Sequence, residues 1–181
     1  FNRLLSSAIS TYGEPNFEDK KEDTKIIQTQ EKISNKNYFL IKDIKAIDDW
    51  IKEAEEVGEL AVDTETSSLD PHQADLIGIS LSSKIGKACY IPLNHNSKEN
   101  INKDLVLKKL KPLLEDPSIK KIGQNIKFDF IVLLKQGIKL SSMEDTMLMS
   151  YVLDAGKNRH NMDTLSEIHL GPKTIAFKDL V

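Results

Sequence analysis

The chain has 181 residues, of which 39% are hydrophobic and 29% charged, and its formal net charge is −3. This composition is ordinary for a globular domain with one good-sized core, and no run approaches the roughly 18 apolar residues of a membrane span. The charge neither favours nor excludes a nucleic-acid substrate. Duplex binders are usually basic, whereas an enzyme that holds phosphates through metal ions can be acidic overall.

The single cysteine, Cys89, excludes an internal disulfide and fits a reducing compartment. It lies in an apolar run, so we interpret it as a core residue rather than a nucleophile. The four histidines are widely spaced and do not predict a zinc site. No signal peptide opens the chain, and a first residue that is Phe1 rather than methionine suggests a piece of a longer polypeptide.

Three segments are predicted along the chain. Residues 1–9 carry apolar side chains at helical spacing and are expected to end a preceding domain or helix. Residues 10–36 are polar, mixed in charge and without clear periodicity, which predicts a flexible linker. Residues 37–181 are expected to form the folded domain.

The first half of this domain predicts a strand, a helix and then a meander. Tyr38 to Ile41 is typical of a strand, Asp43 is a plausible N-cap, and the apolar stripe that follows it stops at Gly58. Short turns then separate three strand-like segments, which predicts antiparallel pairing. These strands are expected at 59–66, 75–82 and 87–93.

In the second half, helices and short strands alternate. Asn125 is expected to cap a helix that Gly137 ends. Further helices are predicted at 103–115, 144–153 and 162–170, and short strands at 120–123 and 138–140. The order predicts an α/β fold with a ribonuclease H-like mixed sheet, in which three antiparallel strands precede parallel strands and helices flank the sheet.

The strand at 59–66 contains two carboxylates, Asp63 and Glu65, on an otherwise apolar pattern. Side chains two residues apart point to the same face of a strand, about 6.5–7 Å apart. Two such anions are costly to desolvate unless a cation lies between them, and carboxylate oxygens suit Mg²⁺ or Mn²⁺. The pair therefore indicates metal-dependent phosphate chemistry, and the alternative is a solvated, inert turn at a strand end.

A second segment, Gly123-Gln124-Asn125, leads from the short strand at 120–123 into the next helix. Exposed amides at such a turn can hold a nucleotide edge or a phosphate. Asp129 lies in the first turn of that helix, where the macrodipole favours an anion even without a catalytic role.

Together these motifs resemble the proofreading 3′–5′ exonuclease domain of bacterial DNA polymerase I, a family A DNA polymerase of the DEDDy, ribonuclease H-like superfamily. The Asp63-Thr64-Glu65 sequence and the segment from Gly123 to Asp129 match its first two motifs, and the resemblance runs from about Asn37 to Val181. Further landmarks follow in order. They are Tyr90-Ile91-Pro92, Lys111 to Asp116, Asp145-Thr146-Met147, Arg159-His160 and Met162-Asp163.

The resemblance implies hydrolysis of the 3′-terminal phosphodiester of single-stranded DNA with two divalent ions, Mg²⁺ or Mn²⁺. Asp63 would bridge both ions, Glu65 would hold the ion on the side of the nucleophile, and Asp129 would hold the other. The implied setting is a monomer in the bacterial cytoplasm, with no membrane and with the polymerase domain of the same parent chain as partner.

The resemblance also implies residues that contact the substrate. Leu69 and Phe177 would wedge against the terminal bases. Thr66, Gln124, Asn125, Phe128 and Arg159 would contact the frayed 3′ strand. The residues alone favour plainer interpretations for four of them, namely core packing for Leu69, helix-face packing for Phe128, a solvated charge for Arg159 and a hydrophobic near a chain end for Phe177.

The family's third motif, Tyr-x-x-x-Asp, has no counterpart after Arg159 in this sequence. The stretch Tyr151-Val152-Leu153-Asp154 is one residue short and lies before Arg159, and Asp145 matches a different landmark. We therefore expect residues 1–181 alone to be weakly active or inactive.

Two alternatives remain beside this function. One is an exoribonuclease of the same superfamily, which would use the same carboxylates and differ in what contacts the 2′-hydroxyl. The other is a non-catalytic structural module of the polymerase, which the retention of all three carboxylates disfavours.

Overall fold

The computed structural model describes residues 6–7, 9–11, 13, 37–96 and 99–171. The chain divides into two compact units, residues 1–31 and 32–181, with the division inside the predicted linker. In the first unit the described residues 6–7 and 9–11 are helical, and the Thr11 hydroxyl donates to the Ser7 carbonyl at 2.9 Å. The rest of the predicted N-terminal helix, and nearly all of the linker, lies outside the described residues.

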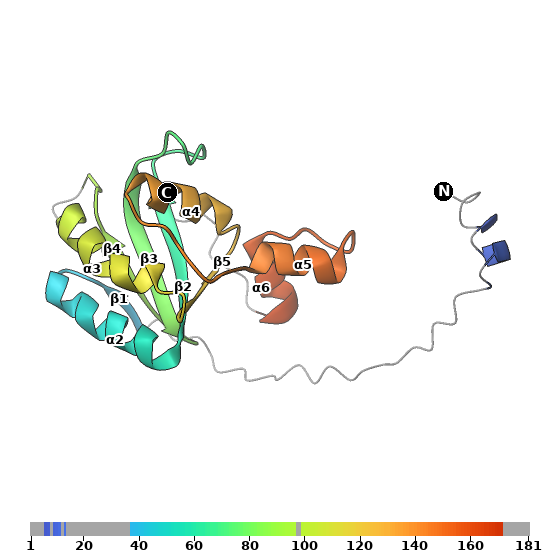
Figure 1. Ribbon diagram of the computed structural model, residues 1–181, viewed down its shortest axis with the longest axis horizontal. Helices are drawn as coiled ribbons and strands as arrows, with labels where there is room; N and C mark the ends of the chain where they lie inside the picture. The colour runs from blue at the N-terminus through green and yellow to red at the C-terminus, as the bar shows by residue number, and fades with distance from the viewer. Residues whose placement is uncertain (1–5, 8, 12, 14–36, 97–98, 172–181) are drawn as a thin grey trace. The chain divides into compact units, whose positions relative to one another are not determined.

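The described residues of the second unit form a six-stranded mixed sheet (Figure 1) with the order β1-β4-β3-β2-β5-β6. The central strands β2, β3 and β4 are antiparallel, while β1 pairs parallel with β4 and β5 pairs parallel with β2 and β6. The predicted ribonuclease H-like mixed sheet is therefore confirmed. The strands are β1 (Tyr38–Leu40), β2 (Glu59–Thr66), β3 (Leu76–Lys84), β4 (Lys87–Pro92), β5 (Lys120–Gly123) and β6 (Met143–Asp145).

Capping residues mark the ends of the first helical segment. Asp43 caps a short 3₁₀ turn by accepting from the Lys45 N–H, and the helix that follows stops at Gly58, which has a left-handed φ of 77°. The helical elements are η2 (Ile44–Ala46), α2 (Ile47–Val57), α3 (Lys103–Glu115), α4 (Lys127–Lys135), α5 (Thr146–Asp154) and α6 (Met162–His169).

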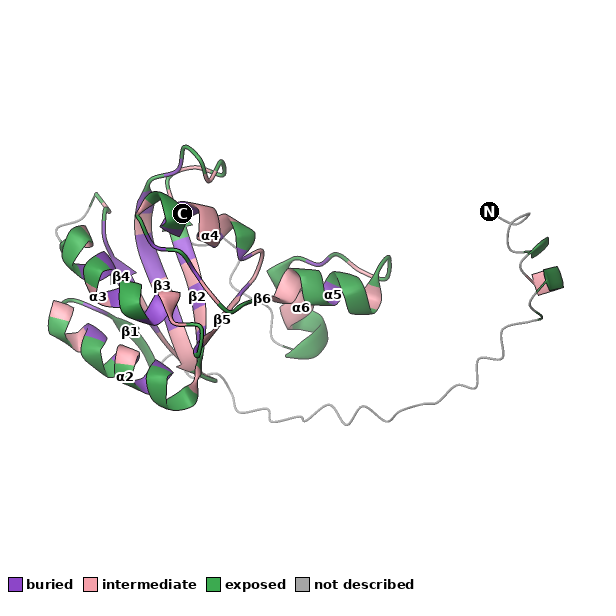
Figure 2. Cartoon of the chain, in the orientation of Figure 1, coloured by how far each residue is buried: buried purple, intermediate pink, exposed green. Residues whose placement is uncertain are grey.

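The two faces of the sheet carry different side chains, and buried residues lie along the central strands (Figure 2). One face carries the alternate apolar residues of the central strands, among them Leu60, Val62 and Leu81, and packs against α2, α3 and α4 in one core. The side chains between them in β2, including Ala61 and Asp63, point to the opposite face. The predicted carboxylate pair therefore lies on the face away from the main core.

One predicted strand is wrong. Residues 138–140 join no sheet, and the sixth strand is instead β6, which pairs with β5. Ile138 and Leu140 are fully buried in the core, so their apolar pattern reflects packing of a connecting segment rather than backbone pairing. The helix expected from Glu144 correspondingly begins at Thr146, because residues 143–145 belong to β6.

Cys89 is buried in this core, and burial raises the pKa of its thiol to about 12. This fits its interpretation as a packing residue. No helix among the described residues is long and apolar enough to cross a membrane.

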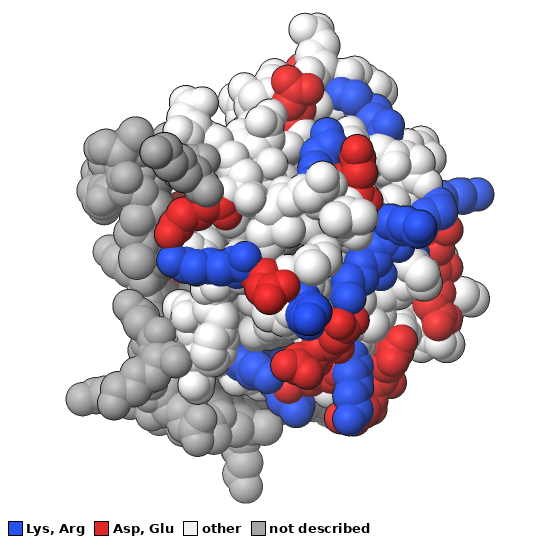
Figure 3. All heavy atoms as spheres, turned by 90° about the vertical axis from the view of Figure 1, so that its left-hand side faces the viewer, with Lys and Arg blue, Asp and Glu red and all other residues white. Residues whose placement is uncertain are grey.

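Charged side chains on the face shown in Figure 3 are of mixed sign, with acidic and basic groups interspersed. Among the described residues, Glu53 contacts the ammonium groups of both Lys84, at 2.9 Å, and Lys87, at 2.7 Å. The viewed face therefore presents no single-sign field that would attract a nucleic-acid backbone.

Two adjacent leucines of α4 test the packing. Leu133 is 0% exposed and Leu134 is 48% exposed. Leu133→Ala should lower the free energy of unfolding by about 2–5 kcal/mol because it leaves a cavity in the core, whereas the matched change Leu134→Ala should cost less than about 1 kcal/mol. Urea unfolding measures both, and equal losses would contradict this placement of α4.

Candidate active site

Asp63 and Glu65 lie side by side on the polar face of β2. Their partners across the antiparallel ladder are Ser80 and Gly78 of β3, so neither carboxylate faces a bulky residue of that strand. The register shifts between Glu65 and Thr66, and such an irregularity bends a strand and re-aims its side chains. The carboxylates therefore occupy an open part of the sheet surface at the end of β2.

Asp129 reaches this strand from the first turn of α4. Its side chain is 2% exposed, and its Oδ1 accepts the backbone N–H of Thr64 at 2.8 Å and the Thr64 hydroxyl at 2.6 Å. The pairing of β5 with β2 extends only to Ala61, so the edge of β2 beyond this point has no neighbouring strand. Asp129 supplies the acceptor that the missing strand would have given Thr64.

The three carboxylates interact electrostatically. Burial raises the pKa of Asp63 to about 6, and the charges of Asp129 and then Glu65 add to the rise. Burial also raises the pKa of Asp129, although the Thr64 hydrogen bonds oppose the shift; Asp145 raises it further. Among the described residues, none of the ion pairs to a lysine includes one of these three carboxylates.

These residues fit a divalent metal in their chemistry, since hard cations prefer carboxylate oxygens. As they stand, no three Asp, Glu, His or Cys side chains of the described residues are close enough to share an ion. Thr64 uses only Oδ1 of Asp129, and Glu65 is exposed and able to change rotamer. The second oxygen of Asp129 and the Glu65 carboxylate therefore take no part in the Thr64 contacts.

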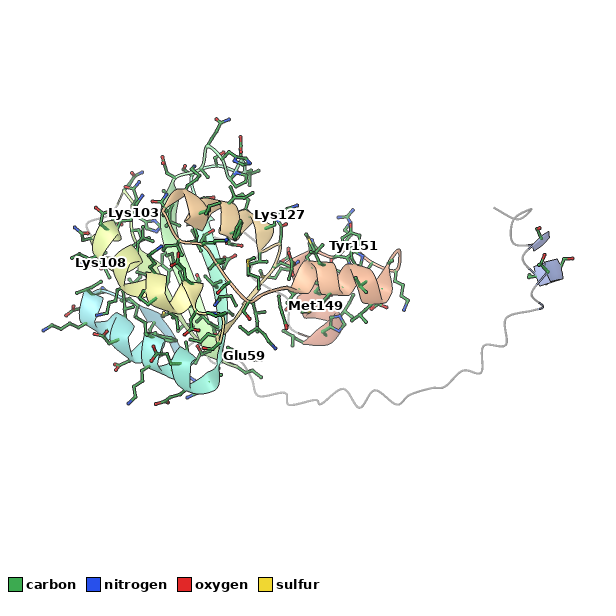
Figure 4. All side chains as sticks on the ribbon, viewed as in Figure 1. Glu59, Lys103, Lys108, Lys127, Met149 and Tyr151 are labelled. Atoms are coloured by element: carbon green, nitrogen blue, oxygen red, sulfur yellow. The ribbon has the colours of Figure 1, made fainter. Side chains whose placement is uncertain are left out.

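A groove of about 740 Å³ begins at Asp63 and runs between the polar face of the sheet and helices α5 and α6. Its walls are largely apolar, and Met149, labelled on α5 in Figure 4, belongs to them. Residues of four strands form its floor, including Ala61, Ser80, Ser82, Ala88 and Ile122. The groove therefore gives access to one of the three carboxylates from a surface suited to flat apolar groups.

Gln124 lines the same groove, but its side chain is bound within the protein. Its amide nitrogen donates to the His160 carbonyl at 2.8 Å, and its amide oxygen accepts from the Thr146 hydroxyl at 2.6 Å. The structure thus joins β5 to the α5–α6 loop through Gln124. Arg159 is exposed in that loop next to His160, so its segment lies at the Gln124 end of the groove.

Asn125 does not cap α4, contrary to the prediction. Its backbone is left-handed, with φ of 59°, and Ile126 occupies the N-cap position of α4 without a side-chain hydrogen bond. The Asn125 N–H instead donates to Asp145 Oδ1 at 3.0 Å. A left-handed residue turns the chain sharply, which places α4 directly beyond the end of β5.

The remaining predicted contacts vary in exposure. Leu69 is 97% exposed, which excludes core packing, and its loop is anchored where Lys135 Nζ donates to the Ala74 carbonyl at 2.8 Å. Phe128 is partly buried against the core, so its packing interpretation fits the structure. The Thr66 hydroxyl donates to the Ser68 carbonyl at 3.0 Å. Phe177 lies outside the described residues.

Residues 151–154 and Asp145, which were compared with the third motif above, make local contacts. Tyr151 lies against the buried His160 ring, with centroids 3.9 Å apart, and Asp154 pairs with Lys157 at 2.5 Å. Asp145 caps α5 by accepting from the Met147 and Leu148 N–H groups. These contacts give each of the three residues a local structural role.

Sequence reasoning missed Thr64, which holds Asp129 in place. The signal was available in the motif itself, because a hydroxyl between two same-face carboxylates must point to the opposite face of the strand. What the sequence could not show is that Asp129, 65 positions later, meets it there.

Comparison with known proteins shows that the chain is similar to nucleases. A family model described as 3′–5′ exonuclease matches residues 38–181. DNA polymerase I of Pseudomonas aeruginosa is 43% identical over 150 residues, covering 80% of this chain and 16% of that protein. DNA polymerase I of Borreliella burgdorferi is 37% identical over 137 residues, covering 75% of this chain and 15% of that protein. The chain thus spans about a sixth of the length of these relatives.

Solved structures agree in fold. The apo form of a nuclease is similar with a TM-score of 0.61 at 27% identity, covering 80% of this chain and 65% of that one. The catalytic core of RRP6 from Trypanosoma brucei reaches a TM-score of 0.64 at 14% identity, covering 78% and 37%, which is a likeness of fold alone.

Thr64 provides a test of how Asp129 is held. Thr64→Val removes a hydrogen bond to a buried carboxylate and should lower the free energy of unfolding by about 1.5–3 kcal/mol. Thr64→Ser keeps the hydroxyl and should lose only about 1 kcal/mol for the buried methyl. Urea unfolding in EDTA distinguishes them, and a valine variant as stable as the serine variant would sink this assignment.

The raised pKa of Asp63 makes stability depend on pH. Between about pH 4 and pH 6 the folded state binds more protons than the unfolded chain, so stability falls as the pH rises and stays lower above that window. Asp63→Asn should therefore be more stable than the wild type at pH 8 in EDTA by about 1–3 kcal/mol, with the gain vanishing near pH 4. Thermal unfolding across this range measures it. Asp104→Asn, an exposed residue in the first turn of α3, should bring no such gain.

Proposed function

This chain belongs to the 3′–5′ exonuclease family, and from that premise we propose that it removes nucleotides from the 3′ end of single-stranded or frayed DNA. The observation that carries the proposal is the electrostatic coupling of Asp63, Glu65 and Asp129 at the end of β2, where none of the described lysines pairs with them. Three anions so placed are costly without a cation and favourable with one.

In this proposal the three carboxylates hold two divalent ions, Mg²⁺ or Mn²⁺. Asp63 would contact both ions, Glu65 would hold the ion on the side of the nucleophile, and Asp129 would hold the other. Bound ions of this kind activate water and stabilise charge on the attacking and leaving oxygens. Thr64 fixes Asp129 through Oδ1 and so leaves its other oxygen for the ion.

Substrate contacts follow from exposure and position. Leu69 presents an exposed apolar side chain just beyond β2, where a terminal base would stack without sequence preference. Thr66, Gln124, Asn125, Phe128 and Arg159 are proposed to contact the frayed 3′ strand. Phe177 is proposed to complete the apolar wedge.

DNA is proposed over RNA because the DNA polymerases I of Pseudomonas aeruginosa and Borreliella burgdorferi are 43% and 37% identical to this chain. The proposed partners are a single-stranded 3′ end and a polymerase domain of the same bacterial, cytoplasmic polypeptide. The exoribonuclease alternative becomes an outcome of the test below. A purely structural module is disfavoured because Asp63, Glu65 and Asp129 are all present.

The fourth carboxylate of the family remains a prediction. We propose that a helix bearing Tyr-x-x-x-Asp completes the site and that residues 1–181 without it cleave slowly. A longer form of the polypeptide that supplies this helix should then digest DNA much faster than residues 1–181 at equal Mn²⁺. Equal rates would overturn the proposed need for the motif.

A nuclease assay tests the function. With Mn²⁺, single-stranded DNA labelled at its 5′ end should shorten stepwise from the 3′ end, and EDTA should stop the reaction. Asp129→Ala should slow it at least about 100-fold, beyond the roughly 10–100-fold typical of residues that only support a ligand.

The matched control is Asp104→Ala, which removes an exposed aspartate from the first turn of α3 and should leave the rate unchanged. Metal-independent cleavage, or cleavage that survives Asp129→Ala, would overturn the proposal. Faster digestion of RNA of the same sequence would replace it with the exoribonuclease reading.

A further inference from the structure

Tyr90 of β4 lies on the same face of the sheet as the carboxylates. It pairs with Ser80 of β3, and Ser80 pairs with Asp63 of β2, so the three residues form one row across three strands. The next row contains Glu65, Gly78 and Pro92. Paired residues point to the same face, so Tyr90 shares its surface with both carboxylates of β2.

The Tyr90 ring lies diagonally over Gly78. A Cβ atom at position 78 would lie 1.9 Å from the Tyr90 hydroxyl oxygen and 2.3 Å from Cζ, so the phenol tip occupies the space of the absent side chain. Gly78 is the direct partner of Glu65. Since neighbouring strands are about 4.8 Å apart, the hydroxyl lies beside Glu65.

Electrostatics support this proximity. Burial raises the pKa of Tyr90 to about 12, and the negative charge of Glu65 contributes to the rise. The Tyr90 hydroxyl therefore keeps its proton at neutral pH and is available as a donor.

His95 fixes the hydroxyl in this position. Its Nε2 is 2.6 Å from the Tyr90 hydroxyl oxygen, and the two rings meet edge to face with centroids 5.6 Å apart. The backbone of His95 is held in turn by Asn100, whose Oδ1 accepts the His95 N–H at 2.8 Å and whose Nδ2 donates to the His95 carbonyl at 2.6 Å. This reciprocal pair of hydrogen bonds holds the backbone that carries the imidazole.

The direction of the hydrogen bond follows from the neighbouring carboxylate. A tyrosine hydroxyl has one proton to give and two lone pairs, and an ionised carboxylate can only accept. When His95 donates through Nε2–H, the Tyr90 proton is left available for Glu65; when His95 accepts, the Tyr90 proton is used by His95 and only lone pairs are left beside an anion. The first arrangement is the favourable one.

We propose that Tyr90, held by His95, is a positioning residue that orients the Glu65 carboxylate for its divalent ion. The inference rests on the proposed function, because it assumes that Glu65 is a metal ligand. Hydrogen-bond partners of ligating carboxylates restrict the ligand's rotamers and typically contribute about 10–100-fold to metal affinity.

The test is Mn²⁺ binding to the whole 181-residue chain, followed by the electron paramagnetic resonance signal of free Mn²⁺. Tyr90→Phe keeps the ring over Gly78 and should weaken Mn²⁺ binding about 10-fold or more, with the melting temperature in EDTA changed by less than about 2–4 °C. Tyr151→Phe, which removes an exposed hydroxyl from α5, is the matched control and should bind Mn²⁺ normally.

A double variant isolates the role of His95. His95→Ala should weaken Mn²⁺ binding in the wild type but add almost nothing to Tyr90→Phe, because His95 acts through the hydroxyl. Additive losses would show that His95 acts on its own and would overturn the proposed order of contacts.

Asp63→Ala tests the proposed metal site separately from the role of Tyr90. If it abolishes Mn²⁺ binding while Tyr90→Phe leaves the affinity unchanged, the positioning role is wrong and the metal site stands. If Asp63→Ala binds Mn²⁺ as the wild type does, the proposed metal site itself fails, and the role of Tyr90 fails with it.

Discussion

The pair of hydrogen bonds from Thr64 to Asp129 is the contact on which the rest of the site depends. It joins a strand to a helix 65 positions away and satisfies a backbone donor at an open sheet edge. Because Asp129 is buried, loss of this contact would leave an anion without compensation in the core. The same bonds therefore satisfy the backbone N–H of Thr64 and hold Asp129 against β2.

The sequence predicted the parts of this site that depend on local periodicity. The alternation along β2 was enough to place Asp63 and Glu65 on one face, and the strand–turn–helix order was enough to bring Asp129 towards them. The prediction from the sequence failed where tertiary contacts determine the local structure. Ile138 and Leu140 have a strand-like pattern but are buried in a connection, and Asn125 adopts a left-handed backbone instead of capping. Neither outcome is encoded within a few neighbouring residues.

The two faces of the sheet have different surroundings. The apolar face, packed by α2, α3 and α4, supplies the rigid core on which the strands of the candidate site rest. The polar face has small residues at Ala61, Ser80 and Gly78, so that the carboxylates and the Tyr90 ring can occupy the surface without crowding. The core packs on one face of the sheet and Asp63 and Glu65 lie on the other, while Asp129 meets Thr64 from the core side.

Helix α5, which forms one wall of the groove, is held differently from the sheet. Of its nine residues only Ser150 is buried, although most of the helix is apolar. So little burial means that α5 detaches at a lower free energy than the strands unfold. The groove therefore has a fixed floor of strands and a more easily displaced wall at α5, so it can widen while Asp63 and Asp129 keep their places.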